Sequence, residues 1–256
     1  MNDPKDRFQK RFWEIDFMRG IAIIMMITFH SAFNLYYFDL FDINIDSTPW
    51  WLLARSTATI FIFLVGTSLT LSYSKAKRSK SRKGIFAKYI IRGFKIFFWG
   101  IFITVITYLF LGDAFVRFGI LHFIGLSIII ALPFLRFKKI NIIIGSVIVI
   151  IGYYIESFTV ETNWLMWIGL RPASFYTVDY FPLLPWFGLI LFGIFAGNSL
   201  YPDHERRFEL PDLSDIGPIK IFSFLGKHSL LIYLLHQPVI IILMIIFGII
   251  DISVFL

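Results

Sequence analysis

One stretch near the end of the chain decides the fold. Residues Ser229–Ile250 read SLLIYLLHQPVIIILMIIFGII and contain no Asp, Glu, Lys or Arg. About 20 consecutive apolar residues in an α-helix cross the hydrocarbon core of a bilayer. The backbone must be helical there, because no water is present to satisfy its hydrogen bonds. The stretch therefore predicts a transmembrane helix.

The rest of the chain has the same character. It is 57% hydrophobic and 16% charged, with a mean hydropathy of +0.75, whereas soluble domains are about 45–50% apolar and about 25% charged. The sequence predicts an all-α, polytopic membrane protein with about seven transmembrane helices, in one domain over residues 1–256. The seven predicted spans are Phe17–Phe38, Trp51–Tyr73, Tyr89–Leu111, Gly119–Leu135, Ile140–Ile155, Phe181–Gly197 and Ser229–Ile250.

The formal charge of +7 is concentrated in four segments, so it predicts orientation rather than nucleic-acid binding. With seven spans, all four segments lie on one side of the membrane. The positive-inside rule then places the amino terminus in the cytoplasm and the carboxyl terminus outside the cell membrane. The basic residues are Lys5, Arg7, Lys10 and Arg11; Lys75, Lys77, Arg78, Lys80, Arg82, Lys83 and Lys88; Arg136, Lys138 and Lys139; and Arg206, Arg207, Lys220 and Lys227.

Several kinds of chemistry are excluded by what the sequence lacks. The chain has no cysteine, which rules out thiol nucleophiles and thiolate metal ligands. It has no G-x-S-x-G, H-E-x-x-H or G-x-x-x-x-G-K-[ST] motif. We predict no metal cofactor.

Ionisable side chains inside membrane spans are costly and become functional hypotheses by default. Asp16 and Arg19, spaced i,i+3 at the start of the first span, can pair on one helix face, either for function or only as an interfacial ion pair. His30 lies 11 residues past Arg19, about 16 Å deeper in a helix. His122 is either a functional residue or an interhelical strut. His236 is either functional or a partner for carbonyls released by Pro238.

Four segments in order together resemble a known family. They are RFWEIDFMRG at Arg11–Gly20 leading to His30, GILHFIG at Gly119–Gly125, DYFPLLPWFG at Asp179–Gly188, and LGKHSLLIYLLHQP at Leu225–Pro238. The set is similar to prokaryotic members of the heparan-alpha-glucosaminide N-acetyltransferase-like family, which includes YeiB-like proteins. This resemblance implies a single transmembrane acyltransferase domain that takes acetyl-CoA from the cytoplasm and meets a sugar amine or hydroxyl on the far side. Lysosomal members have their catalytic histidine beyond the first motif helix, but residues 33–50 here contain none, so the role passes to His30 or another histidine.

The chemistry of acyl transfer then indicates a role for each group of polar residues. A histidine can take the proton of an attacking amine or hydroxyl, and donors must stabilise the oxyanion. We assign catalysis to His30, His122 and Asp179, with His30 as leading base. The predicted acceptor-binding residues are Asn34, Trp186 and His236. Phosphates of the coenzyme need cations, for which we predict Arg19, Arg92, Lys95, Lys227 and His228.

Two other classes remain open at this stage. One is a transporter or channel in which the histidines relay protons. The other is a non-catalytic scaffold. For either class the predicted partners include membrane lipids and no nucleic acid, and a homodimer is compatible with the sequence. The acceptor, the length of the acyl chain, and the choice between direct transfer and an acyl-histidine intermediate stay undetermined.

Overall fold

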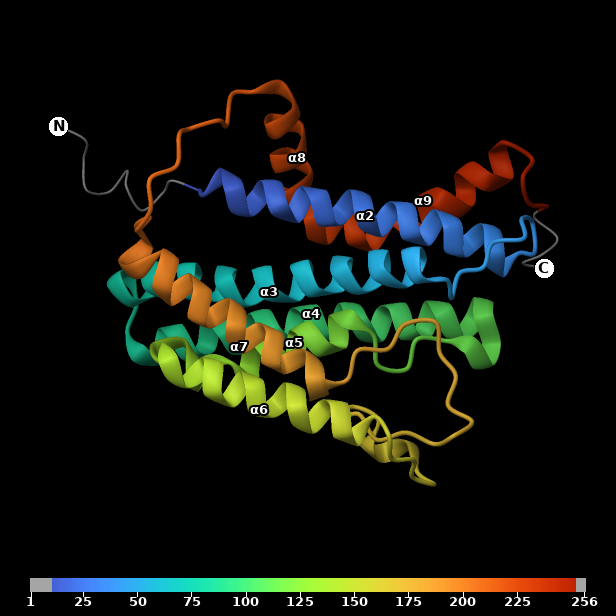
Figure 1. The fold of residues 1–256 in the computed structure, drawn as a ribbon, viewed down its shortest axis with the longest axis horizontal. Helices are drawn as coiled ribbons and strands as arrows, with labels where there is room; N and C mark the ends of the chain where they lie inside the picture. Colours follow the sequence, from blue (N-terminus) through green and yellow to red (C-terminus); the bar gives the residue numbers. More distant parts are fainter. Residues whose placement is uncertain (1–10, 252–256) are drawn as a thin grey trace. The chain divides into compact units, whose positions relative to one another are not determined.

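The computed structural model describes residues 11–251, and their regular structure is helical, apart from two isolated β-bridges. The basic residues Lys5, Arg7 and Lys10 lie outside the described residues. Figure 1 shows the helices in chain order. They are α2 (Trp13–Tyr37), α3 (Thr48–Ser79), α4 (Arg82–Leu111), α5 (Ile120–Ile130), α6 (Lys139–Ile155), α7 (Leu183–Leu200), α8 (Gly217–Lys227) and α9 (Ser229–Ile246), with 3₁₀ turns η1 (Gly112–Ala114), η2 (Leu132–Arg136), η3 (Asn163–Leu165) and η4 (Pro202–His204).

Five of the helices in residues 11–251 are long and apolar enough to cross a membrane, namely α2, α3, α4, α7 and α9. The prediction of an all-α membrane protein is confirmed at this level. Helices α5 and α6 are apolar but shorter, at 11 and 17 residues, so the predicted count of seven is not reached by length alone. Helix α5 ends before Pro133, which stands at the start of η2 and has no N–H to continue an α-helical ladder.

Helix α8 is not among the predicted helices, because the stretch before α9 reads as a long polar segment in the sequence. Its start carries Pro218 in the first turn, where a missing N–H costs nothing. Its buried residues are Ser223 and Gly226, and the single residue His228 separates its end from the start of α9. The helix is amphipathic and packs along α2.

The chain folds into two compact units. Unit 1 comprises Met1–Phe61 and Leu210–Leu256, and unit 2 comprises Ile62–Glu209. Helix α3 runs through the boundary, so its first part belongs to unit 1 and the remainder to unit 2. The predicted organisation as one transmembrane domain stays a prediction.

In unit 1, α2 and α8 approach so closely that only glycine fits at two facing positions. A Cβ at Gly20 would collide with the backbone carbonyl of Phe222, and one at Gly226 would collide with the carbonyl of Asp16. Small residues at such crossings let two backbones meet, which gives membrane helices the packing that lipid itself does not drive. Helix α9 continues along α2 after the break at His228.

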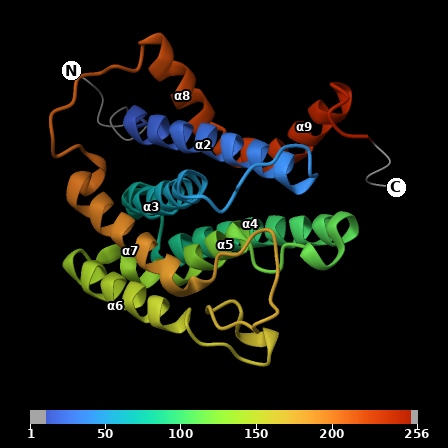
Figure 2. The same cartoon turned by 45° about the vertical axis from the view of Figure 1, so that its right-hand side comes forward.

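In unit 2, glycines at close helix crossings also join other helix pairs. Gly66 of α3 and Gly193 of α7 each lie against the backbone of the opposite helix, and Thr67 donates a hydrogen bond to the Gly193 carbonyl over 3.1 Å. Helices α4 and α5 meet at Gly93 and Gly125. Figure 2 shows α4 beside α5 and α6 beside α7 within this unit.

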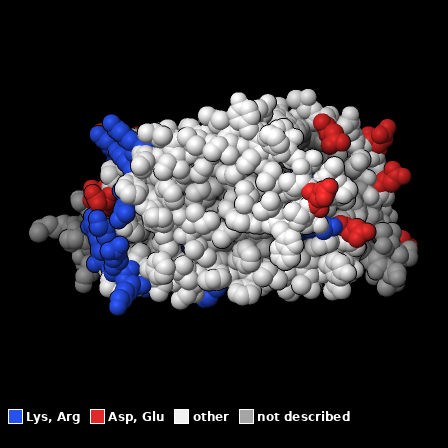
Figure 3. Space-filling view, turned by 90° about the horizontal axis from the view of Figure 1, so that it is seen from below, with Lys and Arg blue, Asp and Glu red and all other residues white. Residues whose placement is uncertain are grey.

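The connections of unit 2 fall at two opposite ends. At one end, Asn198 of α7 donates to the carbonyls of Leu135 and Phe137 over 3.1 and 2.8 Å, and Arg78 reaches the carbonyl of Asp203 over 3.4 Å. The basic loops after α3, α5 and α7 therefore share this end. Figure 3 shows one face on which Lys and Arg gather at one end and most Asp and Glu at the other, with an uncharged band between. Within unit 2 the basic loops thus lie at one end, and the predicted orientation in a membrane stays a prediction.

Candidate active site

A cluster of four polar side chains joins α2 to α9 within unit 1. The Asn34 amide donates to the side-chain oxygen of Gln237 over 2.9 Å, and Nε2 of Gln237 lies 3.2 Å from Nδ1 of His30. The rings of His30 and His236 have centroids 4.8 Å apart. We call His30, Asn34, His236 and Gln237 the α2–α9 polar cluster.

Helical spacing brings these residues together. His30 and Asn34 are four residues apart, so they share one face of α2, while His236 and Gln237 lie in the turn of α9 that precedes Pro238. Asn34 and His236 are buried, and His30 and Gln237 are half-buried. The predicted site residues His30, Asn34 and His236 are thus brought into one place. Gln237 was not assigned a role from sequence, although an amide in an otherwise apolar run was the available signal.

His236 has one nitrogen bound to the backbone and the other unsatisfied. Nδ1 hydrogen-bonds the carbonyl of Tyr233, one residue before the Leu234 carbonyl that Pro238 leaves without its helical donor. Because a neutral imidazole has one donor and one acceptor nitrogen, donation from Nδ1 leaves a lone pair on Nε2. That Nε2 is buried and has no hydrogen-bond partner within the described residues.

The start of α2 is tied to the end of α8 by charged groups. The predicted pair is confirmed, since Nη1 of Arg19 lies 2.8 Å from Oδ1 of Asp16. The same Nη1 is 3.4 Å from the carbonyl of Gly226, at the negative end of α8. Asp16 is 4% exposed and also lies 3.5 Å from Nε of Arg11. Asp16 and Arg19 therefore clamp α8 onto α2, which supports a structural role for the pair.

The predicted coenzyme-binding cations are distributed over both units. Lys227 and His228 are exposed at the end of α8 in unit 1, near the Arg19 clamp, and Nδ1 of His228 lies 2.9 Å from the Phe224 carbonyl. Arg92 and Lys95 are exposed on α4 in unit 2. Helix α2 is unbroken from Trp13 to Tyr37, so the rise of about 16 Å from Arg19 to His30 holds.

Unit 2 contains a second histidine site, at the start of α5. Nδ1 of His122 accepts a hydrogen bond from the backbone N–H of Gly119 over 3.3 Å, and Oδ2 of Asp179 accepts one from Ile120 over 3.1 Å. A carboxylate is favoured there because a helix N-terminus carries partial positive charge. His122 and Asp179 were predicted to be near each other, and both engage this N-terminus.

Two aromatic rings hold the imidazole of His122 in place. Its ring stacks on Phe118 and meets Phe97 edge-on, with centroid distances of 5.5 and 5.2 Å.

Burial raises the pKa of Asp179 to about 6, against the lowering effect of the Ile120 hydrogen bond. The predicted residue Trp186 is buried in α7 with its ring 4.9 Å from that of Phe181.

Apolar helices with histidines packed between them define an integral membrane protein that has polar centres within its helical units. A family model described as heparan-alpha-glucosaminide N-acetyltransferase, catalytic, matches residues 11–238. Because the match covers most of the chain, the protein belongs to this family, and it is a membrane acetyltransferase by family. The resemblance predicted from the four motifs is confirmed. No curated protein and no solved structure matches the chain.

Proposed function

We propose that this protein transfers an acetyl or other acyl group from cytoplasmic acyl-CoA to an amine or hydroxyl of a sugar-type acceptor at the outer side of the membrane. Family membership supports the transferase class. The observation that carries the site is the α2–α9 polar cluster, in which two histidine rings lie 4.8 Å apart within largely apolar stretches of α2 and α9.

The cluster supplies both proton-transfer functions that acyl transfer needs. Gln237 presents its amide nitrogen to Nδ1 of His30, so the neutral His30 ring carries its proton on Nε2. His236 offers the complementary group, a buried lone pair on Nε2. A pair of rings with one donor and one acceptor can take a proton from the nucleophile and return one to the leaving group.

The reaction balances without any further reactant. The acceptor nitrogen or oxygen attacks the carbonyl carbon of the thioester and loses a proton to the histidine pair. The carbon–sulfur bond then breaks, and the CoA sulfur leaves with that proton as a thiol. In this hydrogen-bonding state Nε2 of His236 is the proton acceptor of the pair and the Nε2–H of His30 is the proton donor. Asn34 is a candidate donor to the oxyanion. A chain without cysteine restricts the routes to direct transfer or an acyl-histidine intermediate.

Position along α2 links the coenzyme to this chemistry. Lys227 and His228 are exposed beside the first turns of α2 and can contact phosphate groups. Arg19 is already engaged by Asp16 and the Gly226 carbonyl, so it serves mainly to hold this surface in place. A pantetheine arm lying along α2 would carry the thioester toward His30, about 16 Å further on.

The test is thiol release by the purified protein. Because the chain has no cysteine, a thiol reagent added to protein and acetyl-CoA reports free CoA without a protein background. We expect release of CoA that increases when glucosamine is supplied as an acceptor, together with acetylated glucosamine in the products. Proton or solute flux in liposomes without any thiol release would contradict the proposal and favour a transporter with a histidine relay.

A further inference from the structure

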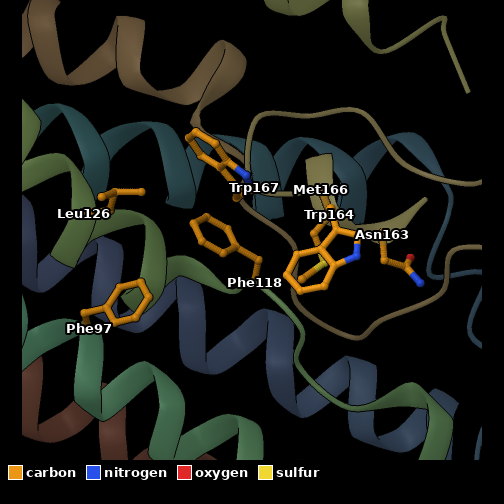
Figure 4. Close-up of a pocket in the computed structure, with 7 residues that line it drawn as sticks. All are labelled: Phe97, Phe118, Leu126, Asn163, Trp164, Met166 and Trp167. Atoms are coloured by element: carbon orange, nitrogen blue, oxygen red, sulfur yellow. The ribbon is translucent and has the colours of Figure 1, made fainter. Parts of the chain in front are cut away.

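An apolar groove of about 510 Å³ lies in unit 2 between α4, α5 and the segment at and after η3. Figure 4 shows Phe97, Phe118 and Leu126 on one part of its wall and Trp164 and Trp167 on another. Asn163 is the one lining residue that is neither aromatic nor apolar. The volume lies within the range of small-molecule sites, but a wall with so little polarity is suited to a hydrocarbon ligand.

The groove borders the His122 site. Phe97 and Phe118 line the groove, and the same two rings enclose the imidazole of His122. The η3 side of the wall is held in place by the Tyr180 hydroxyl, which donates to the Met166 carbonyl over 2.7 Å, and by the Leu183 N–H, which donates to the Trp167 carbonyl over 2.8 Å. A ligand in the groove would therefore end close to the α5 N-terminus that His122 and Asp179 occupy.

One wall of the groove belongs to α4, a candidate membrane span whose apolar residues are mostly exposed. Only 6% of the most apolar window of α4 is buried, and Phe98, next to the groove residue Phe97, is 63% exposed. Helix α5 begins at Ile120, and it carries the wall about 9 Å further, to Leu126, at the rise of a helix. A hydrocarbon chain can thus enter from the membrane without crossing water, and lie along α5.

We propose that this groove holds the hydrocarbon chain of a lipid-anchored acceptor and leaves its polar head outside the groove, past the Asn163–Trp164 end. That the bound lipid is the acyl acceptor rests on the proposed function, whereas binding of its hydrocarbon chain in the groove does not. Trp164 is 86% exposed at this end, and exposed indoles of membrane proteins prefer the level of the lipid headgroups. The acceptor would then be a glycolipid presented from the outer leaflet, not a sugar free in water.

Binding is tested first, without catalysis. The probe is a hexadecyl glucosaminide with a photoreactive diazirine in its hydrocarbon chain. It is added to the intact protein in lipid nanodiscs. We expect adducts concentrated on the groove residues. Leu126→Trp, which fills the groove, should reduce these adducts about tenfold, while Ile143→Trp on the lipid-exposed face of α6 should leave them unchanged. Adducts spread evenly over exposed apolar residues, or equally reduced in both variants, would overturn the proposal.

Acyl transfer gives the second readout. Octyl glucosaminide should have a KM at least about tenfold lower than methyl glucosaminide in the wild type and in Ile143→Trp, and this advantage should disappear in Leu126→Trp. If octyl glucosaminide had an equally lower KM in both variants, its partition into the membrane would explain the difference. The proposal that the groove binds the hydrocarbon chain would then be wrong. Absence of transfer to either acceptor, with adducts still confined to the groove, would instead contradict the proposed function and leave the lipid site standing.

Discussion

The two histidine sites differ in what holds the ring. In the α2–α9 polar cluster, His30 is contacted by the side-chain amide of Gln237 and by the ring of His236. At the start of α5, His122 is bound by a backbone N–H and enclosed by two phenylalanine rings. Side-chain partners can change their donor and acceptor roles during a reaction, whereas a backbone N–H is only a donor.

This difference indicates different functions for the two sites. A ring whose Nδ1 accepts from the backbone behaves as a cap and a strut, which is the structural interpretation weighed for His122. The His30 ring, which hydrogen-bonds a side-chain amide and lies against the His236 ring, is suited to moving protons. The comparison therefore favours the cluster for chemistry and the α5 start for structural support.

The largest expected effect is on His30. His30→Ala should lower acyl transfer by about 10²–10⁴-fold, because general acid–base groups contribute on this scale. Stability and acetyl-CoA binding should change little. The measurement is single-turnover transfer from acetyl-CoA. His122→Ala is the comparison variant, and it should mainly lower the melting temperature. Normal turnover in His30→Ala with an inactive but folded His122→Ala would reverse the assignment of the two sites.

Gln237 should have the next largest effect, as a positioning residue. Gln237→Leu has similar volume but no hydrogen bond to His30, so kcat should fall by about 10–100-fold with KM for acetyl-CoA unchanged. The pH profile of kcat should also move, because the partner of Nδ1 is lost. A fall in stability with an unmoved pH profile would show that Gln237 only packs.

The cations around α8 should separate into structural and binding groups. Arg19→Ala should lower the free energy of unfolding by about 1–3 kcal/mol, because it leaves Asp16 buried without its closest partner. Lys227→Ala should leave stability unchanged but reduce the thermal stabilisation that acetyl-CoA provides. Melting curves with and without acetyl-CoA decide both. A normal coenzyme shift in Lys227→Ala would remove this lysine from the coenzyme site.

The smallest effect concerns Asp179 and pH. Its pKa is raised by burial to about 6, so the charged form is disfavoured in the folded state. The free energy of unfolding should therefore be relatively highest below the ordinary aspartate pKa of about 4 and should decrease as pH rises to about 6. Asp179→Asn should show less of this decrease. Parallel stability curves for the two proteins across this pH range would contradict the assignment.

The sequence predicted what depends on local rules. Hydropathy placed the long helices, and the i,i+3 spacing predicted the Asp16–Arg19 pair, because both follow from helix geometry alone. The proximity of His122 and Asp179 was also anticipated. The contact between His30 and Gln237 could not be predicted, since it depends on the register of α2 against α9, more than 200 residues apart in the chain.

Helix α8 escaped prediction for a related reason. Its sequence mixes Pro, Gly, Ser and Lys with a few apolar residues, so its propensity is poor, and packing on α2 stabilises it as a helix. The engagement of Arg19 by the Gly226 carbonyl was likewise hidden, because backbone acceptors leave no mark in sequence. Arg19 was consequently predicted as a coenzyme ligand.

The glycine crossing between α2 and α8 limits how this protein can be redesigned or can diverge. A larger residue at Gly20 or Gly226 would strike a main-chain carbonyl of the opposite helix rather than a side chain. Trimming a neighbouring side chain cannot relieve such a collision, so no second-site substitution compensates for it. Among distant sequences that have lost most of their similarity, this pair of glycines, separated in sequence by the whole of unit 2, would be a more durable mark of the architecture than the apolar residues around it.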